Sequence, residues 1–97
     1  EFKLEYKIEE DGMSDLKIIS LNREYPNRKI DKPEKINSFL WLDNENLLYS
    51  ISYEGIYLYN CKQNITNKVI DGNEKFELYE VENNVVKYDD KQIRITM

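Results

Sequence analysis

The sequence lacks histidine entirely and contains a single cysteine, Cys61. Without histidine, neither a Ser–His nor a Cys–His pair can activate a nucleophile, and the commonest metal-ligating side chain is missing. A single cysteine also excludes an internal disulfide and a cysteine metal cluster. We therefore expect a protein that is not an enzyme and that holds no metal and no cofactor.

Long hydrophobic runs are also absent, because no stretch approaches the roughly 20 apolar residues of a membrane-spanning helix. The net charge of −5 would repel a polyanion on average. Basic residues do gather between Arg23 and Lys35, but Glu24, Asp31 and Glu34 are interleaved with them, as is typical of a solvated loop. We therefore expect no nucleic-acid partner and no membrane span.

The dominant pattern in the chain has a period of two residues. From Phe2 to Ile8, apolar residues alternate with charged ones, which predicts a half-buried strand. Similar short segments follow at a spacing of roughly 8–12 residues, separated by turn residues such as Asp11-Gly12, and this predicts an all-β, antiparallel fold in one small domain. Strands are expected at residues 2–9, 16–22, 27–30, 36–43, 47–53, 56–60, 67–71, 75–81, 85–89 and 92–96.

The sequence also contains an internal repeat. Residues 27–31 (NRKID) and 67–71 (NKVID) lie 40 positions apart, and each is followed by an aromatic strand. In this alignment of the two repeats, Trp41 is equivalent to Tyr79. The repeating unit therefore has a length of about 38 to 40 residues and contains four expected strands. A four-stranded unit of about that length is typical of a β-propeller blade.

In these features the chain resembles the blades of TolB-like and WD-repeat propellers. The similar segments are an aromatic first strand with a polar turn (FLWLDNEN), an apolar second strand (LLYSIS), an acidic-glycine turn (YEGIYLYN) and a short fourth strand (NRKID or NKVID). The chain departs from the WD pattern because it has no Trp-Asp dipeptide and no Gly-His pair. The resemblance implies a propeller.

The phase of the repeat limits how such a propeller could be completed. We label the strands of a blade a to d from the centre of the propeller outward. On this labelling, the single module 1–97 divides into three units. Residues 1–31 form a partial unit with strands b, c and d, residues 32–71 a full unit a-b-c-d, and residues 72–97 a partial unit with strands a, b and c. A closed ring needs roughly four blades or more. Three alternatives stay open: the chain is part of a longer protein, copies assemble into a ring, or the same hairpins form a small barrel or sandwich.

Tyrosines are concentrated in one expected hairpin, which holds four of the eight between residues 47 and 60. A two-residue turn at Glu54-Gly55 predicts a register that pairs Ser50 with Tyr59 and divides the tyrosines between two faces. A turn of three or four residues would shift this register, and Glu-Gly signals a two-residue turn more weakly than Asn-Gly does. Candidate residues for stacking on a ligand are Trp41, Tyr57, Tyr59 and Tyr79. Packing between blades is the alternative role for these rings, and we favour it.

Three further motifs match known sites weakly. Residues 43–46 (DNEN) and 71–74 (DGNE) carry oxygen ligands suited to Ca²⁺, but neither fits the twelve-residue calcium loop, so both are expected to be turns. Asn64-Ile65-Thr66 matches the acceptor sequence for N-glycosylation and agrees with a loop at 61–66.

These observations favour a non-catalytic interaction module in a larger or oligomeric propeller. Its partner would be a protein or peptide, or another copy bound through exposed strand edges. The alternatives are a carbohydrate-binding module formed by oligomerisation, with a glycan ligand, and an enzyme fragment whose active groups lie elsewhere. Because the sequence begins within an expected strand, we leave open an upstream segment and slightly favour an extracytoplasmic or cell-surface location.

Overall fold

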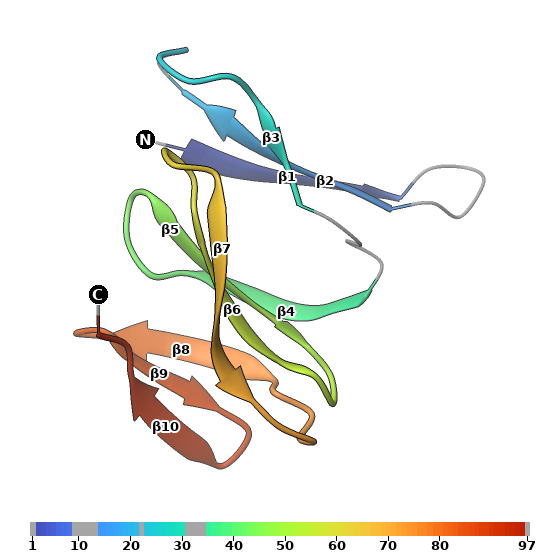
Figure 1. The fold of residues 1–97 in the computed structure, drawn as a ribbon, viewed down its shortest axis with the longest axis vertical. Coiled ribbons are helices and arrows are strands. Elements are labelled where there is room, and N and C mark those ends of the chain that lie inside the picture. The colour runs from blue at the N-terminus through green and yellow to red at the C-terminus, as the bar shows by residue number, and fades with distance from the viewer. Residues whose placement is uncertain (1, 9–13, 22, 31–34, 97) are drawn as a thin grey trace.

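The computed structural model describes residues 2–8, 14–21, 23–30 and 35–96, and these form three antiparallel sheets (Figure 1). Sheet A has the order β1-β2-β3, sheet B β4-β5-β6-β7, and sheet C β8-β9-β10. The strand bounds are β1 Phe2–Ile8, β2 Ser14–Ser20, β3 Arg28–Lys29, β4 Ile36–Trp41, β5 Asn46–Ile51, β6 Gly55–Asn60, β7 Ile65–Asp71, β8 Leu78–Glu82, β9 Val85–Tyr88 and β10 Lys91–Arg94. The predicted all-β, antiparallel class is confirmed.

The three sheets do not close into a barrel. Sheet B lies between sheet A and sheet C, as Figure 1 shows from top to bottom. Within the described ranges, no helix is long and apolar enough to cross a membrane. The turn expected at Asp11-Gly12 lies outside the described residues.

Both faces of sheet B are covered, so the protein has two cores. One core, which we call the aromatic core, packs the rings of Tyr49 and Tyr59 of sheet B against Ile18 of sheet A. The other packs Leu48 and Ile56 of sheet B against sheet C and the segment before it; its other buried members are Phe76, Leu78, Val86, Tyr88 and Ile95. Burial of each large apolar side chain contributes about 1.5–3 kcal/mol, so sheet B stabilises both of its neighbours.

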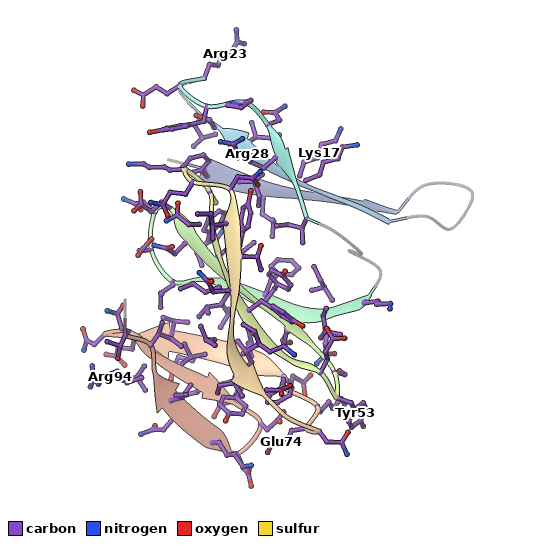
Figure 2. All side chains as sticks on the ribbon, viewed as in Figure 1. Lys17, Arg23, Arg28, Tyr53, Glu74 and Arg94 are labelled. Carbon is purple, nitrogen blue, oxygen red and sulfur yellow. The ribbon has the colours of Figure 1, made fainter. Side chains whose placement is uncertain are left out.

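The register predicted for the tyrosine-rich hairpin is wrong. Ile51 pairs with Gly55 and Tyr49 with Tyr57, which leaves the three residues 52–54 as the loop. Tyr53 adopts the left-handed conformation in this loop, with φ of 63°. Its N–H donates to the carbonyl oxygen of Glu74 at 2.7 Å, and both residues lie at the same end of the molecule (Figure 2).

Gly55 has a different role from the one that the turn pattern suggested. It lies inside β6, where an added Cβ would be 2.4 Å from the carbonyl oxygen of Ile70 on β7. Glycine is therefore needed for close approach of the two backbones and not for the turn. Because the register moves by an odd number of residues, Tyr49, Tyr57 and Tyr59 share one face of sheet B, where the prediction divided them.

The predicted equivalence of Trp41 and Tyr79 is also wrong. Leu47 and Val85 are the aligned positions of the two following strands. Trp41 pairs with Leu47, but the residue that pairs with Val85 is Glu82 and not Tyr79. The loop between β4 and β5 has four residues, but β8 and β9 are joined by only Asn83 and Asn84. Both asparagines have positive φ, as in a type I′ turn. Leu47 lies six residues after its partner Trp41, whereas Val85 lies three residues after Glu82, so the alignment shifts by three positions. This shift leaves Tyr79 at a β-bulge.

Phe76 is held in a strained conformation at the start of sheet C. Its φ is 57°, although its ring is fully buried. The Asp89 carboxylate accepts the N–H of Phe76 at 3.0 Å and the N–H of Glu77 at 2.8 Å. Positive φ is unfavourable for an aromatic residue and costs about 1–3 kcal/mol, so the two hydrogen bonds offset this strain. They also explain why β8 begins at Leu78 and not at residue 75 as predicted.

Two serine hydroxyl groups join this segment to sheet B. Ser38 Oγ on β4 lies 2.7 Å from Ser50 Oγ on β5, donates to the carbonyl oxygen of Phe76 at 3.1 Å and accepts the N–H of Leu78 at 2.9 Å. Ser50 is fully buried. The bonds made by Ser38 satisfy the carbonyl oxygen of Phe76 and the N–H of Leu78, where the chain enters β8.

We expect Asp89→Asn to lower the free energy of unfolding by about 2 kcal/mol, because an amide nitrogen would replace one of the two accepting oxygens. Asparagine tolerates the positive φ of 50° found at this position, so the backbone itself is not penalised. Urea denaturation measures the change. Asp90→Asn, at the exposed neighbouring residue, is the control. Equal stability of the two variants would contradict the role given to Asp89.

Candidate functional site

An open groove with a volume of about 470 Å³ lies where sheet B faces the end of β10. It combines an apolar wall with a polar rim, as peptide and small-molecule sites commonly do. The lining residues are Asp43, Glu45, Asn46, Leu58, Asn60, Gln63, Ile65, Asn67, Val69 and Thr96.

The apolar wall comes from β6 and β7. Leu58 is half-buried, and 48% of the Ile65 surface is exposed. A β-bulge in the pairing of β6 with β7 leaves Val69 without a directly opposite residue, and both Val69 and Ile70 pack toward the core between sheets B and C. The bulge thus widens the apolar surface that β7 presents to the groove.

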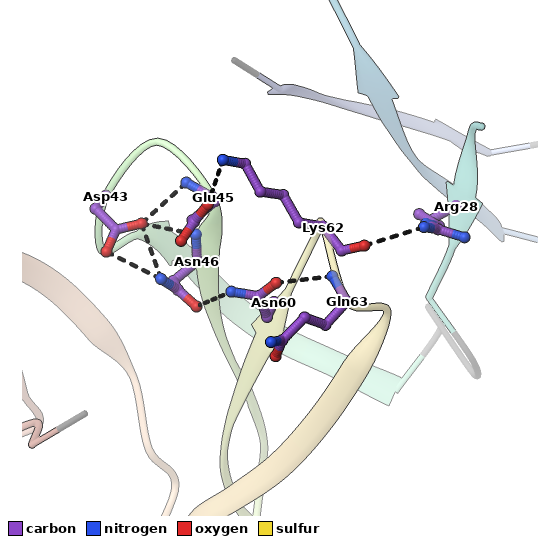
Figure 3. A network of polar contacts seen from close by, with 7 residues as sticks. All are labelled: Arg28, Asp43, Glu45, Asn46, Asn60, Lys62 and Gln63. Atoms are coloured by element: carbon purple, nitrogen blue, oxygen red, sulfur yellow. Dashed lines mark hydrogen bonds and ion pairs between the residues drawn. The ribbon is translucent and has the colours of Figure 1, made fainter. Parts of the chain in front are cut away.

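The polar rim is a hydrogen-bonded network that closes the ends of β5 and β6 (Figure 3). The Asp43 carboxylate accepts the backbone N–H groups of Glu45 at 2.9 Å and Asn46 at 2.8 Å, and it also accepts Asn46 Nδ2. Asn46 Oδ1 accepts Asn60 Nδ2 at 3.0 Å, and Asn60 Oδ1 accepts the N–H of Gln63 at 2.9 Å. The network fixes both loops beside the groove before any ligand binds.

Arg28 of sheet A bonds to the loop between β6 and β7, which also carries Gln63 of the rim. Its guanidinium donates to the carbonyl oxygen of Cys61 at 3.4 Å. It also donates to the carbonyl oxygen of Lys62 at 3.2 Å (Figure 3). The Lys62 ammonium in turn lies 3.0 Å from the Glu45 carboxylate, and this hydrogen bond raises the pKa of Lys62. Arg28 therefore stabilises the loop between β6 and β7 from the side opposite the groove.

Three of the four candidate stacking residues, Trp41, Tyr57 and Tyr59, pack in the core between sheets A and B, whereas Tyr79 lies apart on sheet C. Tyr59 is buried, with 2% of its surface exposed, and its hydroxyl donates to Asn64 Oδ1 at 2.6 Å. Tyr57 is half-buried, and its ring stacks on Tyr49 with a centroid distance of 5.2 Å. Trp41 is half-buried against the same aromatic core. Tyr79 is 57% exposed, on sheet C.

The acidic turns and the sequon carry local structural roles. Asp43 uses its oxygens within the rim, Asp71 pairs with Lys68 at 3.1 Å, and Glu74 pairs with Lys91. Over the part of the chain that the structure describes, no group of three potential metal ligands is found. Asn64 is exposed and has φ of 56°, and the loop expected at 61–66 is shorter, because β7 begins at Ile65.

Two ionisable side chains are buried in the aromatic core. Burial raises the pKa of the Cys61 thiol to about 12, with a further contribution from the nearby Asp43 and Glu45 carboxylates. Burial also raises the pKa of Tyr59 to about 12. At neutral pH the Cys61 thiolate is therefore scarce, and the thiolate is the nucleophilic form of cysteine.

Most of the groove residues were not among the sequence candidates, although Asp43, Glu45 and Asn46 belong to the acidic motif 43–46. Asn46 and Asn60 become a cross-strand pair only in the observed register, so the wrong turn length concealed them. Leu58 and Val69 look like ordinary core residues in the sequence, and their exposure depends on where sheet C ends. The feature of the sequence that could have indicated the rim is the presence of an asparagine at the start of β5 (Asn46) and another at the end of β6 (Asn60).

The chain was compared with family models, curated proteins and solved structures, and none of these matches it.

We expect stability to fall as the pH rises from about 9 toward 12. In the unfolded chain, Cys61 and Tyr59 would lose their protons near their usual pKa values of 9.0 and 10.0, whereas the folded protein retains them up to about 12. The folded state then binds more protons than the unfolded state, so stability decreases with pH. Urea denaturation from pH 8 to 11 measures this slope.

Tyr59→Phe should make the slope shallower, because the buried hydroxyl is removed. Tyr53→Phe, at a position that is 65% exposed, is the matched control. The same slope in both variants would contradict the assignment of the effect to the buried hydroxyl.

Proposed function

We propose that this chain is a non-catalytic interaction module, built of propeller-type blades, that binds a protein or peptide in the groove between sheets B and C. The single observation that carries the proposal is the exposed apolar wall of Leu58, Ile65 and Val69 beside a prearranged polar rim. Exposed apolar surface bordered by polar groups commonly marks an interaction site. The volume of about 470 Å³ is within the usual range of ligand pockets.

The strand order supports the blade assignment. Neighbours in the sequence pair as neighbours in each sheet, and the described sheets have three, four and three strands, as the proposed units b-c-d, a-b-c-d and a-b-c require. The similar segments 27–31 and 67–71 contribute the outermost strands β3 and β7 of their sheets. We propose the repeat units 1–31, 32–71 and 72–97 on this basis.

The outer face of sheet C carries an ion pair that disfavours the stacking of a further blade on it. Lys87 and Glu80 make an ion pair of 2.7 Å there, and both side chains are substantially exposed. A further blade stacked on this face would have to desolvate the pair, which is costly. We therefore propose that the chain joins a larger or oligomeric propeller through exposed strand edges in preference to this face of sheet C.

The non-catalytic part of the proposal is supported by how the reactive groups are used. The Cys61 thiol is buried and has a pKa of about 12. The Asp43 carboxylate already accepts two backbone N–H groups and the Asn46 amide. Neither group is free to act as a nucleophile or as a general base.

We expect a displayed library of random peptides to yield ligands for the wild-type protein with micromolar dissociation constants. Ile65→Lys should weaken them at least tenfold, because an ammonium group would occupy the apolar wall. Ile65 is already half exposed, so the variant should fold.

Tyr79→Lys is the matched control, since it makes the same change at an exposed residue that does not line the groove. A library that yields no ligand, or ligands equally weakened by both variants, would refute the proposed function.

A carbohydrate-binding role is the second candidate, and one observation favours it. A hollow of about 310 Å³ is lined by Phe2, Trp41, Asp43 and Asn44, which combine aromatic rings with amide and carboxylate groups. Such sets can stack on and hydrogen-bond to a sugar.

If this hollow binds a glycan, array binding should be lost in Trp41→Ala and reduced in Asn44→Ala. The second variant changes only an exposed residue, so its effect cannot come from loss of the core. Light scattering with and without the glycan would show whether binding needs an oligomer. No binding on the array by the wild-type protein would dismiss the carbohydrate role.

A further inference from the structure

The Tyr57 hydroxyl on β6 is hydrogen-bonded to a carboxylate. It donates to Glu54 Oε2 at 2.6 Å, a length typical of a charge-assisted bond between two oxygen atoms. Burial, and then the hydrogen bond and negative charge of Glu54, raise the pKa of Tyr57. The phenol therefore keeps its proton at neutral pH, and a group that can accept this proton is already in contact with it.

The hydroxyl of the nearby Tyr59 has a partner of different chemistry. It donates to Asn64 Oδ1, also at 2.6 Å. An amide oxygen accepts a hydrogen bond but does not take up a proton near neutral pH, whereas a carboxylate can act as a base. The two bonds are equally long, so the acceptor alone distinguishes them. A proton can leave Tyr57 for its partner, but it cannot leave Tyr59 in this way.

The Tyr57 ring is in contact with the aromatic core. It stacks on the Tyr49 ring, with the centroids 5.2 Å apart and the planes inclined by 14°. Trp41 packs against the same core. In the sheet, Trp41 pairs with Leu47, and Leu47 pairs with Tyr59. An electron can therefore pass between the indole ring and either of two tyrosines, Tyr57 and Tyr59, through packed side chains.

A cation beside the Tyr57 ring disfavours the loss of an electron alone. Lys68 Nζ lies 5.5 Å from the ring centroid and pairs with Asp71 at 3.1 Å. An ammonium group is attracted by the electrons of a neutral ring and would be repelled by a ring that had become positive. If the hydroxyl proton leaves together with the electron, the ring stays neutral and this repulsion is avoided. Glu54 is placed to receive that proton.

We propose that Tyr57 and Glu54 form an oxidation site, at which a one-electron oxidant leaves a neutral tyrosyl radical. The Tyr57 ring gives one electron to the oxidant, and its hydroxyl proton passes to Glu54 Oε2. The products are the reduced oxidant, the tyrosyl radical and a protonated carboxyl group. A radical formed first on Trp41 is repaired by the same step, because the indole takes the electron from Tyr57 and a proton from the solvent.

Such a site would direct oxidation away from the core. The radical ends on a half-buried ring and not on the fully buried Cys61 in the same cluster. Neither Tyr57 nor Glu54 lines the groove, so this inference is independent of peptide binding there.

The test uses the azidyl radical, a neutral one-electron oxidant of indoles and phenols, generated by pulse radiolysis. Trp41 is the single tryptophan of the chain, so the absorbance of the indolyl radical reports on this residue alone. In the wild-type protein, that absorbance should decay while the absorbance of a tyrosyl radical rises. The rate should not depend on protein concentration, because the electron moves within one molecule. A rate proportional to concentration would overturn the inference.

Glu54→Gln should slow this transfer at least tenfold, because an amide keeps the hydrogen bond of Tyr57 but cannot take its proton. Glu54 is exposed, so the variant should fold, and near-ultraviolet circular dichroism checks this. Glu77→Gln makes the same change at an exposed residue before β8 and should leave the rate unchanged. Equal rates in the two variants would overturn the role given to Glu54.

Tyr57→Phe should slow the transfer as strongly, since it keeps the stacked ring and removes the proton. Tyr59→Phe should change the rate less than twofold, although Tyr59 lies in the same cross-strand row as Trp41. Tyr53→Phe, at a residue that is 65% exposed, should also leave it unchanged. If either of these two variants slows the transfer and Tyr57→Phe does not, the radical ends on another tyrosine and the inference falls.

Discussion

The Asp89 carboxylate holds the backbone of Phe76 in a left-handed conformation, and the arrangement of sheet C depends on this contact. Without it, a fully buried aromatic residue would adopt an unfavourable φ with its N–H unpaired. The conformation turns the chain so that the Phe76 ring enters the core and Leu78 starts the first strand of sheet C. Ser38 on sheet B then holds the same segment through the carbonyl oxygen of Phe76 and the N–H of Leu78.

Sheet B is the centre of the molecule because its two faces have different chemistry. One face presents tyrosine rings to sheet A, and the other presents aliphatic side chains to sheet C. Aromatic residues fill a wide gap with a polar group at one end, so Tyr59 can be buried while its hydroxyl still donates to Asn64. The aliphatic face presents no tyrosine hydroxyl that needs a hydrogen-bond partner, and the part of it formed by Leu58, Ile65 and Val69 lines the groove.

The sequence predicted the class and the succession of strands well, since alternation from Phe2 to Ile8 and the apolar run at Leu47-Leu48 are local signals. The hairpin register could not be obtained this way, because Gly55 is constrained by Ile70 on another strand and Tyr53 takes the conformation usually left to glycine. The groove was missed for a similar reason. It depends on Leu58 and Val69 lying beside the end of β10, about 30 residues further along the chain.

Arg28 has a consequence for the cooperativity of the whole chain. It supplies the side-chain hydrogen bonds that tie sheet A to the loop at Cys61 and Lys62, whereas several polar contacts, including those of Asn37, Ser38 and Tyr53, join sheet B to the segment leading into sheet C. Local opening follows the weakest boundary in a structure. Separation of sheet A from sheet B would have to break the Arg28 hydrogen bonds together with the packing of Ile18 against Tyr49 and Tyr59, so the two sheets are coupled through one loop and one core at the same time.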